Sequence, residues 1–533
     1  MSVSYSRGHH SRTSCTSPPK KRQSDAFLWT KRPHIMSNSS SNAVLYSADG
    51  QPVTLGEILS ALSFALDMTE GARPGHSLRA CLIGMRLGKQ IGLSSQALAD
   101  LYYALLLKDI GCSSNSARMA GAFTAADQVV KQRFKFVDKE KLGKPNREAL
   151  TFVWSNVAPT ANVWSRIRQI YRMVRAPGNL TAEMVEERCE SGALILDKLG
   201  MGIETCAGVY SLDEQWNGHG LPDHLVAQEI PLLGRVCAVA QHLDSFCSEF
   251  GSAKAMATLA DRSGVWFDPD LVRAAESLHQ QEALWENCVP GSDPRLLQTA
   301  VLALDPGSST ALASRHIDLI CSGFADVIDA KSPFTHRHSV GTTEAAVLIS
   351  NAMGLAPSRV DVVRRAAMLH DIGMLSVPNT ILDKPAPLTR EEWVVIHRHP
   401  VLSQEILSRV SAFSEIAILA GQHHEKLDGS GYPFHLHGQQ LSIESRILTA
   451  ADVFSALMES RPHRQDLSPA EILQQLEQDV PHRLDPACFD AIVSVLDQLA
   501  VLPLDDIPGR SADTIPELVM VEPPPFRFEA NPR

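Results

Sequence analysis

The chain repeats itself, and this repetition limits the folds that it can adopt. Residues 75–111 resemble 337–373, and residues 213–222 resemble 424–433 further along. The offset between the copies is 262 residues for the first pair (337 − 75) and 211 for the second (424 − 213), so the first copy carries 51 extra residues (262 − 211), which we place within 120–180. Self-similarity of this kind predicts two domains of the same fold in tandem.

Both copies show the periodicity of helices, and strand-like alternation is scarce. Four residues of the second copy fall at i, i+3, i+4 and i+7, which places them on one helix face: Val363, Ala366, Ala367 and His370. Ser358-x-x-Asp361 is expected to cap the start of this helix, and Thr389-x-x-Glu392 that of another. We therefore expect an all-α protein built from two tandem helical domains.

Changes in composition divide the chain into four parts. Residues 1–45 are basic and serine-rich, which is typical of a disordered tail, with a basic arm for an acidic partner as the alternative. Residues 46–300 hold the first copy and 311–502 the second. Residues 503–533 are broken by prolines and are expected to form a loosely attached tail.

The overall charge and the cysteines exclude several classes of protein. A formal charge of −11 gives no general attraction to nucleic acid or to an anionic membrane. The ten cysteines form no CxxC pair, which favours reduced thiols in the cytoplasm over a secreted disulfide scaffold. No apolar run is long enough to span a bilayer. We expect a soluble cytoplasmic protein that binds neither nucleic acid nor membrane.

The second copy gathers side chains of the kind that bind metals. Any one of these histidines, taken alone, is more often a core or surface residue, and a solvated loop is the ordinary alternative for the stretch 421–433. Asp452 is harder to dismiss, because a carboxylate within an apolar helix is costly unless it is paired or bound to metal. The His370-Asp371 step at a helix end can offer an imidazole to one metal and a bridging carboxylate to two. Two neighbouring metals activate water and clamp a phosphoryl group, which suggests a dinuclear phosphohydrolase.

Residues from about 320 to 500 resemble the HD-GYP domain, a bacterial branch of the HD phosphohydrolase superfamily. The resemblance rests on "HDIG" (370–373), "HHEKLDGSGYP" (423–433) and "RILTAADVFSALMESRP" (446–462), together with shorter matches in the same order. It implies an all-helical domain with a bimetal centre. The implied activity is hydrolysis of cyclic di-GMP to the linear dinucleotide or to GMP.

The same resemblance implies roles for individual residues. His370 and Asp371 would be catalytic, and Asp371 would bridge two divalent metals, with iron or manganese expected and magnesium or another ion as the alternative. The implied metal ligands are His338, His370, Asp371, His399, His423, His424 and Asp452. The implied substrate contacts are Lys331, Gly429, Gly431, Tyr432, Pro433 and Arg446. For Lys331 and Arg446, a salt bridge explains the charge equally well.

Two positions depart from the family pattern. Met374 stands where the family usually has a lysine that holds phosphate or protonates the leaving oxygen, and a thioether does neither. Lys384 and Lys426 are candidate substitutes. Phe334 stands where some members carry a glutamate for a third metal, so two metals are expected.

The first copy keeps the pattern but has lost the ligands. His76 and Asp109 remain. The other ligand positions hold Lys108, Arg188, Leu212, Asp213 and Gln241. Cations at two of these positions repel a divalent metal, so no metal is expected there. Packing against the second copy, dimerisation and ligand sensing are its candidate roles.

Three functions remain open at this stage. The first is a metal-dependent phosphodiesterase for cyclic di-GMP or a related cyclic dinucleotide. The second is a low-activity cyclic di-GMP receptor or scaffold, for which Met374 is the main argument. The third is an HD phosphohydrolase that acts on another nucleotide. A homodimer and signalling-protein partners are compatible with each of them.

Overall fold

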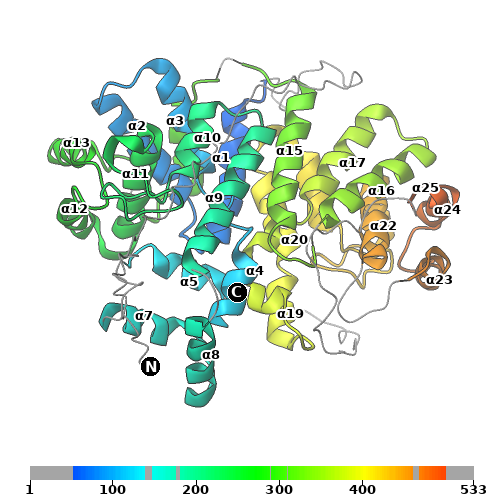
Figure 1. Cartoon of the computed structure of the whole chain (residues 1–533). Coiled ribbons are helices and arrows are strands. Elements are labelled where there is room, and N and C mark those ends of the chain that lie inside the picture. Colours follow the sequence, from blue (N-terminus) through cyan, green and yellow to red (C-terminus); the bar gives the residue numbers. More distant parts are fainter. Residues whose placement is uncertain are drawn as a thin grey trace, which may run out of the picture. The chain divides into compact units, whose positions relative to one another are not determined.

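A computed structural model describes residues 52–137, 147–175, 180–288, 290–308, 310–335, 337–459 and 467–499. These residues form helices joined by loops, and apart from three isolated β-bridges they contain no strand (Figure 1). The expected all-α fold is confirmed. The predicted tails, 1–45 and 503–533, lie outside the described residues, and no helix within the described ranges is long and apolar enough to cross a membrane.

The helices of the first copy lead directly into those of the second. The first copy comprises α1 (Leu55–Thr69), α2 (His76–Gln90), α3 (Ser95–Leu107), α4 (Ser116–Phe123), α5 (Asp127–Phe134), α7 (Arg147–Asn156), α8 (Val163–Arg175), α9 (Leu180–Lys198), α10 (Ile203–Tyr210), η1 (Ala227–Glu229), α11 (Leu232–Phe250), α12 (Ser252–Asp261), α13 (Pro269–Gln280) and α14 (Pro294–Leu302). The second comprises α15 (Ser314–Asp329), α16 (His338–Ala352), α17 (Pro357–Leu369), η2 (Ile372–Ser376), α18 (Asn379–Leu382), α19 (Arg390–Ile396), α20 (His399–Leu407), η3 (Ser411–Phe413), α21 (Ser414–Gln422), η4 (Gly438–Gln440), α22 (Ile443–Met458), α23 (Pro469–Asp479), α24 (Pro486–Ser494) and α25 (Leu496–Leu499).

Equivalent hydrogen bonds, as well as equivalent helices, occur in the two copies. In the first, Asp67 accepts from the amide and the hydroxyl of Ser77, in the first turn of α2. In the second, Asp329 accepts from the amide and hydroxyl of Ser339 in α16 in the same way. Each carboxylate joins a helix to the start of the next, so the sequence repeat is also a repeat of tertiary contacts.

Local signals at the helix starts are right in one case and wrong in the other. Thr389 and Glu392 form the predicted capping box at the start of α19. The cap predicted at Ser358 is wrong, because α17 begins one residue earlier, at Pro357, and its N-cap Ala356 makes no side-chain cap. Proline at the first helical position has the backbone torsion that a helix needs and lacks the amide that would otherwise need a partner.

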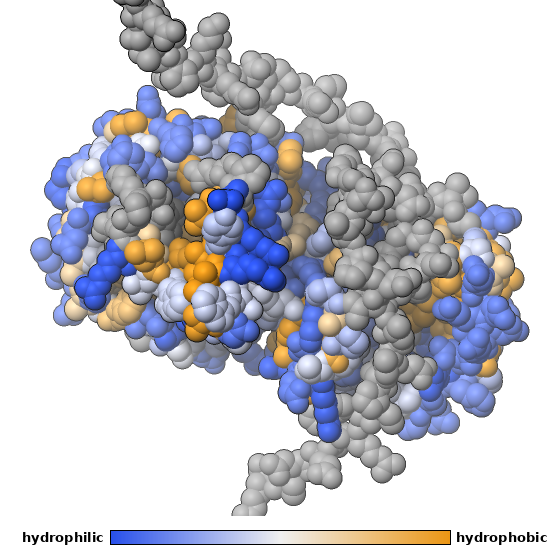
Figure 2. Space-filling view, turned by 60° about the horizontal axis from the view of Figure 1, so that its bottom comes forward, coloured by the Kyte–Doolittle hydropathy of each residue, from blue (hydrophilic) through white to orange (hydrophobic). Residues whose placement is uncertain are grey.

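Helices α7 and α8 lie in the part of the first copy where the extra residues were predicted. Ile170 and Met173 of α8 pack against a small cluster of buried residues that includes Phe123 and Phe152. The remainder of α8 faces solvent, and Trp164 is 81% exposed. Figure 2 brings this side of the molecule forward and shows hydrophobic surface beside strongly hydrophilic surface. Helix α8 is therefore attached along one side, and α7 contributes Phe152 to the same cluster.

The two copies contact each other close to the "HDIG" segment. Helix α1 packs against η2 and α20, and α4 packs against α18. Both copies belong to one compact unit. The backbone that follows His370 and Asp371 therefore rests partly on helices of the first copy.

Candidate metal centre

The side chains predicted to bind metal converge on one place, because several helices end there. Most of these residues begin a helix, cap its last turn or directly follow it, and only Asp452 lies within a helix, α22. In the second copy, three groups of three have donor atoms within 4.8 Å of one another: His338, His370 and Asp452; His399, His423 and His424; and His370, Asp371 and His423. The third group places Asp371 between the other two.

Glycine at position 373 lets the segment after Asp371 approach the helix that carries His399. A Cβ at position 373 would overlap the carbonyl oxygen of His399. The Ser403 hydroxyl then joins the two segments, since it donates to the carbonyl of His370 at 2.6 Å and accepts from the amide of Gly373 at 3.0 Å. The "HDIG" glycine is thus explained by packing, and it fixes the position of the two residues before it.

Asp371 faces both groups of histidines with different oxygens. Its Oδ2 lies 3.4 Å from Nε2 of His370 and 3.8 Å from Nε2 of His338. Its Oδ1 lies 3.2 Å from Nε2 of His399 and 3.6 Å from Nε2 of His423. A carboxylate in this position can give one oxygen to each of two cations.

Asp452 is the second carboxylate at the centre. Its Oδ1 lies 3.1 Å from Nε2 of His338, and its Oδ2 lies 3.6 Å from Nδ1 of His424. The apolar helix α22 therefore buries this carboxylate among histidines.

Hydrogen bonds to backbone carbonyl oxygens fix the orientation of three imidazoles. His370, His399 and His423 each place Nδ1 2.6–2.7 Å from a carbonyl oxygen three residues earlier, so we assign the proton to Nδ1 and the lone pair to Nε2. The Nε2 atoms of His399 and His423 are only 3.1 Å apart. Two lone pairs at this distance repel each other unless a cation or a proton lies between them. The donor set therefore fits a metal.

The charges at the centre support the same fit. Burial alone would raise the pKa of Asp371, but the imidazoles around it hold that pKa well below its usual value, so the carboxylate stays ionised. Burial lowers the pKa of His370 and favours its neutral form, which is the form that binds metal. The Nε2 atom of His370 is buried and has no hydrogen-bond partner among the described residues. A divalent cation would satisfy this atom and balance the carboxylates.

The centre is reached from the side of His424 and Tyr432. The His424 side chain is 27% exposed, whereas none of the other ligand candidates exceeds 12%. The Tyr432 ring lies 4.7 Å from the ring of His424 and stacks on His397 at 4.0 Å, centroid to centroid. A substrate would meet these rings first.

Two predicted phosphate contacts are held in ion pairs with the protein itself. Lys331 is buried, and its ammonium lies 3.2 Å from a carboxylate oxygen of Asp127 in the first copy. Arg446 pairs with Asp485 at 2.9 Å and also donates to backbone carbonyls, including that of Leu441. These ion pairs agree with the salt-bridge explanation of both charges. Contact of Lys331 or Arg446 with substrate stays a prediction.

The glycines predicted to approach a ligand are needed for the loop itself. Gly429 has a φ of 77°, which disfavours other residues, and a Cβ there would meet the His437 ring. A Cβ at Gly431 would overlap the backbone at Glu425. Pro433 follows Tyr432 in this loop. Glu425 closes it, because its carboxylate accepts from the amides of Phe434 and Leu436. A direct role of these residues in binding substrate stays a prediction.

Three residues that the sequence did not single out belong to the centre. Glu459 lies 2.7 Å from Nδ1 of His338 and orients that ring, and Ser403 and His397 act as described above. Glu459 lies within 446–462, a segment that carries the family resemblance, but only tertiary packing shows its partner. His397 precedes His399 by two residues, so the "HRH" triplet was the available signal.

The two candidate substitutes for the missing lysine differ in their surroundings. Met374 is half-buried in η2, next to Gly373. Lys384 pairs with Glu392 at 2.6 Å. No structural observation brings Lys426 to the centre, so its substitution for the family lysine stays a prediction.

Ion pairs occupy the equivalent place in the first copy. Lys108 pairs with Asp109, and Arg188 pairs with Asp213. His76 contacts Asp244 through Nδ1 at 2.6 Å. One group of three, Glu70, Asp109 and Cys112, has donor atoms close enough to hold an ion, but the two carboxylates already have ammonium partners. The expectation that this copy binds no metal stays a prediction.

Comparison with known proteins identifies relatives of most of the chain and of about a third of it. The family described as HD domain matches residues 146–271 and 323–488. The chain is 36% identical over 446 residues to the 3′3′-cGAMP-specific phosphodiesterase 3 of Vibrio cholerae serotype O1, covering 84% of this chain and 95% of that protein. It is 37% identical over 174 residues to the cyclic di-GMP phosphodiesterase response regulator RpfG of Xanthomonas campestris pv. campestris, covering 32% of this chain and 46% of that protein.

A solved structure is similar over most of the chain. It is the crystal structure of a cyclic GMP-AMP specific phosphodiesterase from V. cholerae, with a TM-score of 0.57 and 32% sequence identity. The match covers 85% of this chain and 99% of that one. The tandem arrangement is therefore shared along almost the full length of the relative.

Proposed function

We propose that this chain, which belongs to the HD-GYP family of HD-domain phosphodiesterases, hydrolyses a 3′3′-cyclic dinucleotide at a two-metal centre in its second copy. The single observation that carries the proposal is the position of Asp371 between two groups of histidines, with one oxygen toward each. Iron or manganese is the expected metal, because imidazoles and carboxylates suit both.

We infer 3′3′-cGAMP as the first substrate to test. The relative whose name specifies this dinucleotide aligns over 84% of the chain, whereas the cyclic di-GMP phosphodiesterase from Xanthomonas aligns over 32%. Cyclic di-GMP, the substrate expected from the sequence, remains the second candidate, because that alignment has the slightly higher identity of 37% against 36%.

The chain's own residues would prepare the site for reaction. His370, His399 and His423 hold their lone pairs toward the centre through hydrogen bonds to backbone carbonyl oxygens three residues earlier. Bound divalent cations would polarise a phosphoryl oxygen and lower the pKa of water. Asp371 stays ionised and would bridge the two cations, so we assign it and His370 the catalytic role. The Tyr432 ring would pack against the dinucleotide at the exposed side.

The test uses the purified full chain, with its metal content measured by mass spectrometry. It is incubated with 3′3′-cGAMP, cyclic di-GMP and cyclic di-AMP, and the products are separated by chromatography. We expect two metals per chain and fastest turnover of 3′3′-cGAMP.

The bridging role is tested by Asp371→Asn, with Asp428→Asn in the exposed GYP loop as the matched control. We expect Asp371→Asn to lower both metal content and rate, the rate by more than about 100-fold, and Asp428→Asn to change neither. Full metal content and a normal rate in Asp371→Asn would refute the two-metal assignment. Metal-dependent turnover of cyclic di-GMP alone would correct the substrate.

A further inference from the structure

The first copy contains a cavity at the place where the second copy holds its metal centre. The cavity measures about 120 Å³ and opens partly to solvent. Its lining includes Arg188, Leu212, Asp213 and Gln241, which are the positions of His399, His423, His424 and Asp452 in the other copy. Loss of the metal ligands has therefore left a space that is lined by different chemistry.

The side chains of Arg188 and Lys135 place positive charge in this cavity, where the other copy would bind metals. Arg188 pairs with Asp213, and Lys135 pairs with Glu70 at 2.9 Å. Burial disfavours the charged form of Glu70, but Lys135 holds its pKa below the usual value, so the pair stays ionised. Arg188 has five N–H donors, and its contact with Asp213 leaves others for a ligand.

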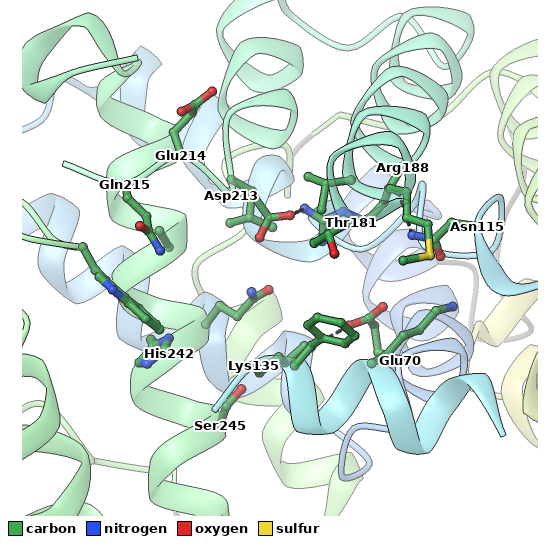
Figure 3. A pocket seen from close by; sticks show the side chains of 18 of the residues that line it. Glu70, Asn115, Lys135, Thr181, Arg188, Asp213, Glu214, Gln215, His242 and Ser245 are labelled. Atoms are coloured by element: carbon green, nitrogen blue, oxygen red, sulfur yellow. Dashed lines mark hydrogen bonds and ion pairs between the residues drawn. The ribbon is translucent and has the colours of Figure 1, made fainter. Parts of the chain in front are cut away.

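The charged groups that face the cavity are two ion pairs. Glu214 is counted among the lining residues, but its carboxylate accepts from the amides of Asp223 and Leu225 and points away from the other labelled side chains in Figure 3. The ammonium of Lys131 is likewise engaged elsewhere, because it donates to the carbonyl of Cys112 and to the hydroxyl of Ser116. The remaining charged residues of the lining are two cations, Lys135 and Arg188, and two anions, Glu70 and Asp213. The guanidinium donors of Arg188 that Asp213 does not use can bind an anionic group.

The opposite wall is aromatic. Figure 3 shows His242 and Gln215 on one side of the cavity and Arg188 and Asn115 on the other. His242 and Trp266 lie edge to face at 5.3 Å, and the Arg262 guanidinium covers Trp266 at 3.7 Å from its ring centre. The second copy has Val453 at the position of His242. The aromatic wall is therefore a feature of the first copy and not a remnant of the metal site.

Buried amide groups in the lining lack partners. The side-chain oxygens of Asn115, Gln215 and Gln241 are buried and have no hydrogen-bond partner among the described residues. Asn115 donates its amide hydrogen to the carbonyl of Met184, so its free oxygen is an acceptor. A buried acceptor without a partner destabilises the ligand-free protein, and a ligand with N–H donors would satisfy it.

We propose that this cavity binds a nucleoside monophosphate. The aromatic wall and the amides suit a base, which stacks on rings and donates through its N–H groups, and the cationic wall suits a phosphate. The single aromatic wall and the Arg188 guanidinium on the opposite side match one base and one phosphate. A nucleoside monophosphate is the end product of complete cyclic-dinucleotide hydrolysis. The binding proposal does not depend on the proposed function, but the identification of the ligand as reaction product rests on it.

Helix α5 connects the cavity to the catalytic segment. Lys131 and Phe134 of this helix line the cavity. In its first turn, the Gln128 amide donates to the carbonyls of Leu375 and Ser376, at 3.2 and 2.9 Å, in the segment that follows Asp371. A ligand that moves α5 would therefore alter the position of the "HDIG" segment and change the rate of turnover.

The binding test uses the full chain after EDTA treatment, so that a metal-loaded catalytic centre does not contribute. Titration calorimetry with GMP, AMP and inorganic phosphate gives the affinity, and circular dichroism checks that the helices persist. We expect one GMP or AMP per chain and weaker binding of phosphate alone. An 8-azido derivative should crosslink to peptides that contain His242 or Trp266.

Two variants test the contacts. Gln215→Met removes an unpartnered amide at similar volume, and Arg188→Lys keeps the charge beside Asp213 but removes the guanidinium fork. We expect each to weaken binding at least about tenfold, whereas the exposed control Gln96→Met leaves it unchanged. Gln215→Met should not lower the melting temperature of the ligand-free protein, because it removes an unmet polar atom.

Each outcome separates this proposal from the proposed function. Two results would overturn the proposed site. One is the lack of saturable binding of either nucleotide. The other is binding that both variants leave intact, with crosslinks only to peptides of the second copy. Stronger binding of phosphate than of either nucleotide would also overturn it. Binding without any hydrolysis by the metal-loaded chain would refute the catalytic proposal alone. Hydrolysis that responds to added GMP in the wild type but not in Gln215→Met would support the link through α5.

Discussion

The ammonium of Lys331 lies 3.2 Å from the carboxylate of Asp127, and this contact joins the second copy to the first. Both side chains are buried. The other oxygen of Asp127 accepts from the amide of Asn379 at 3.0 Å, shortly after the "HDIG" segment. The first copy thus supplies a buried anion that balances a buried cation of the second copy.

The first prediction concerns this pair. Asp127→Leu should lower the free energy of unfolding by about 3–5 kcal/mol, because it leaves the Lys331 ammonium buried without its partner. Lys331→Met should cost less. The double variant should be more stable than the sum of the single effects predicts, since it removes both charges. Urea denaturation followed by circular dichroism measures all three, and strictly additive losses would contradict the coupling.

The sequence predicted the helices and the grouping of metal ligands because both depend on local signals. Periodicity identifies the buried face of α17, and the "HDIG" and "HHE" motifs place their ligands at helix ends. The partners of Lys331 and Arg446 were not predicted, since an ion pair between residues as distant as 127 and 331 depends on tertiary packing. The cap signal at Ser358 misplaced the start of α17, because Pro357 already occupies the first helical position.

Glu459 provides the second prediction, since it holds the ring of His338 through a contact of 2.7 Å. Removing such an outer partner typically costs 10- to 100-fold in metal affinity or activity. We expect Glu459→Ala to show a loss of about this size, and Glu459→Gln a smaller one because the amide oxygen still accepts the hydrogen bond. Metal content during dialysis against a chelator is the measurement. The exposed control Glu477→Ala should retain its metal, and equal retention in Glu459→Ala would show that His338 needs no support.

Met374→Lys tests whether the missing family lysine limits the reaction. One charge-assisted hydrogen bond made in the transition state is worth about 1.5–3 kcal/mol, or roughly 10- to 100-fold in rate. Position 374 is half-buried, so the lysine stem has a path toward solvent. We expect kcat to rise and the metal content to stay constant. A rate that is unchanged or lower would mean that another group fills this role or that the methionine is needed for packing.

The last prediction concerns Asp67, the first-copy counterpart of Asp329. Burial raises the pKa of Asp67 from its usual value of 3.8 to about 6, against the opposing effects of Lys108 and Ser77. Because the folded pKa is raised, the folded protein binds this proton more tightly than the unfolded chain does. Its contribution to stability is therefore complete below pH of about 4 and is lost as the pH rises through about 6.

Asp67→Asn should remove this dependence while keeping an oxygen that accepts from Ser77. A shift of about two pKa units corresponds to about 3 kcal/mol. We therefore expect the unfolding free energy of the wild type, relative to Asp67→Asn, to fall by about that amount between pH 4 and pH 7. Urea denaturation at several pH values measures the difference, with Asp428→Asn as an exposed control. A difference that stays constant with pH would show that Asp67 is ionised throughout, and that Lys108 outweighs burial at this site.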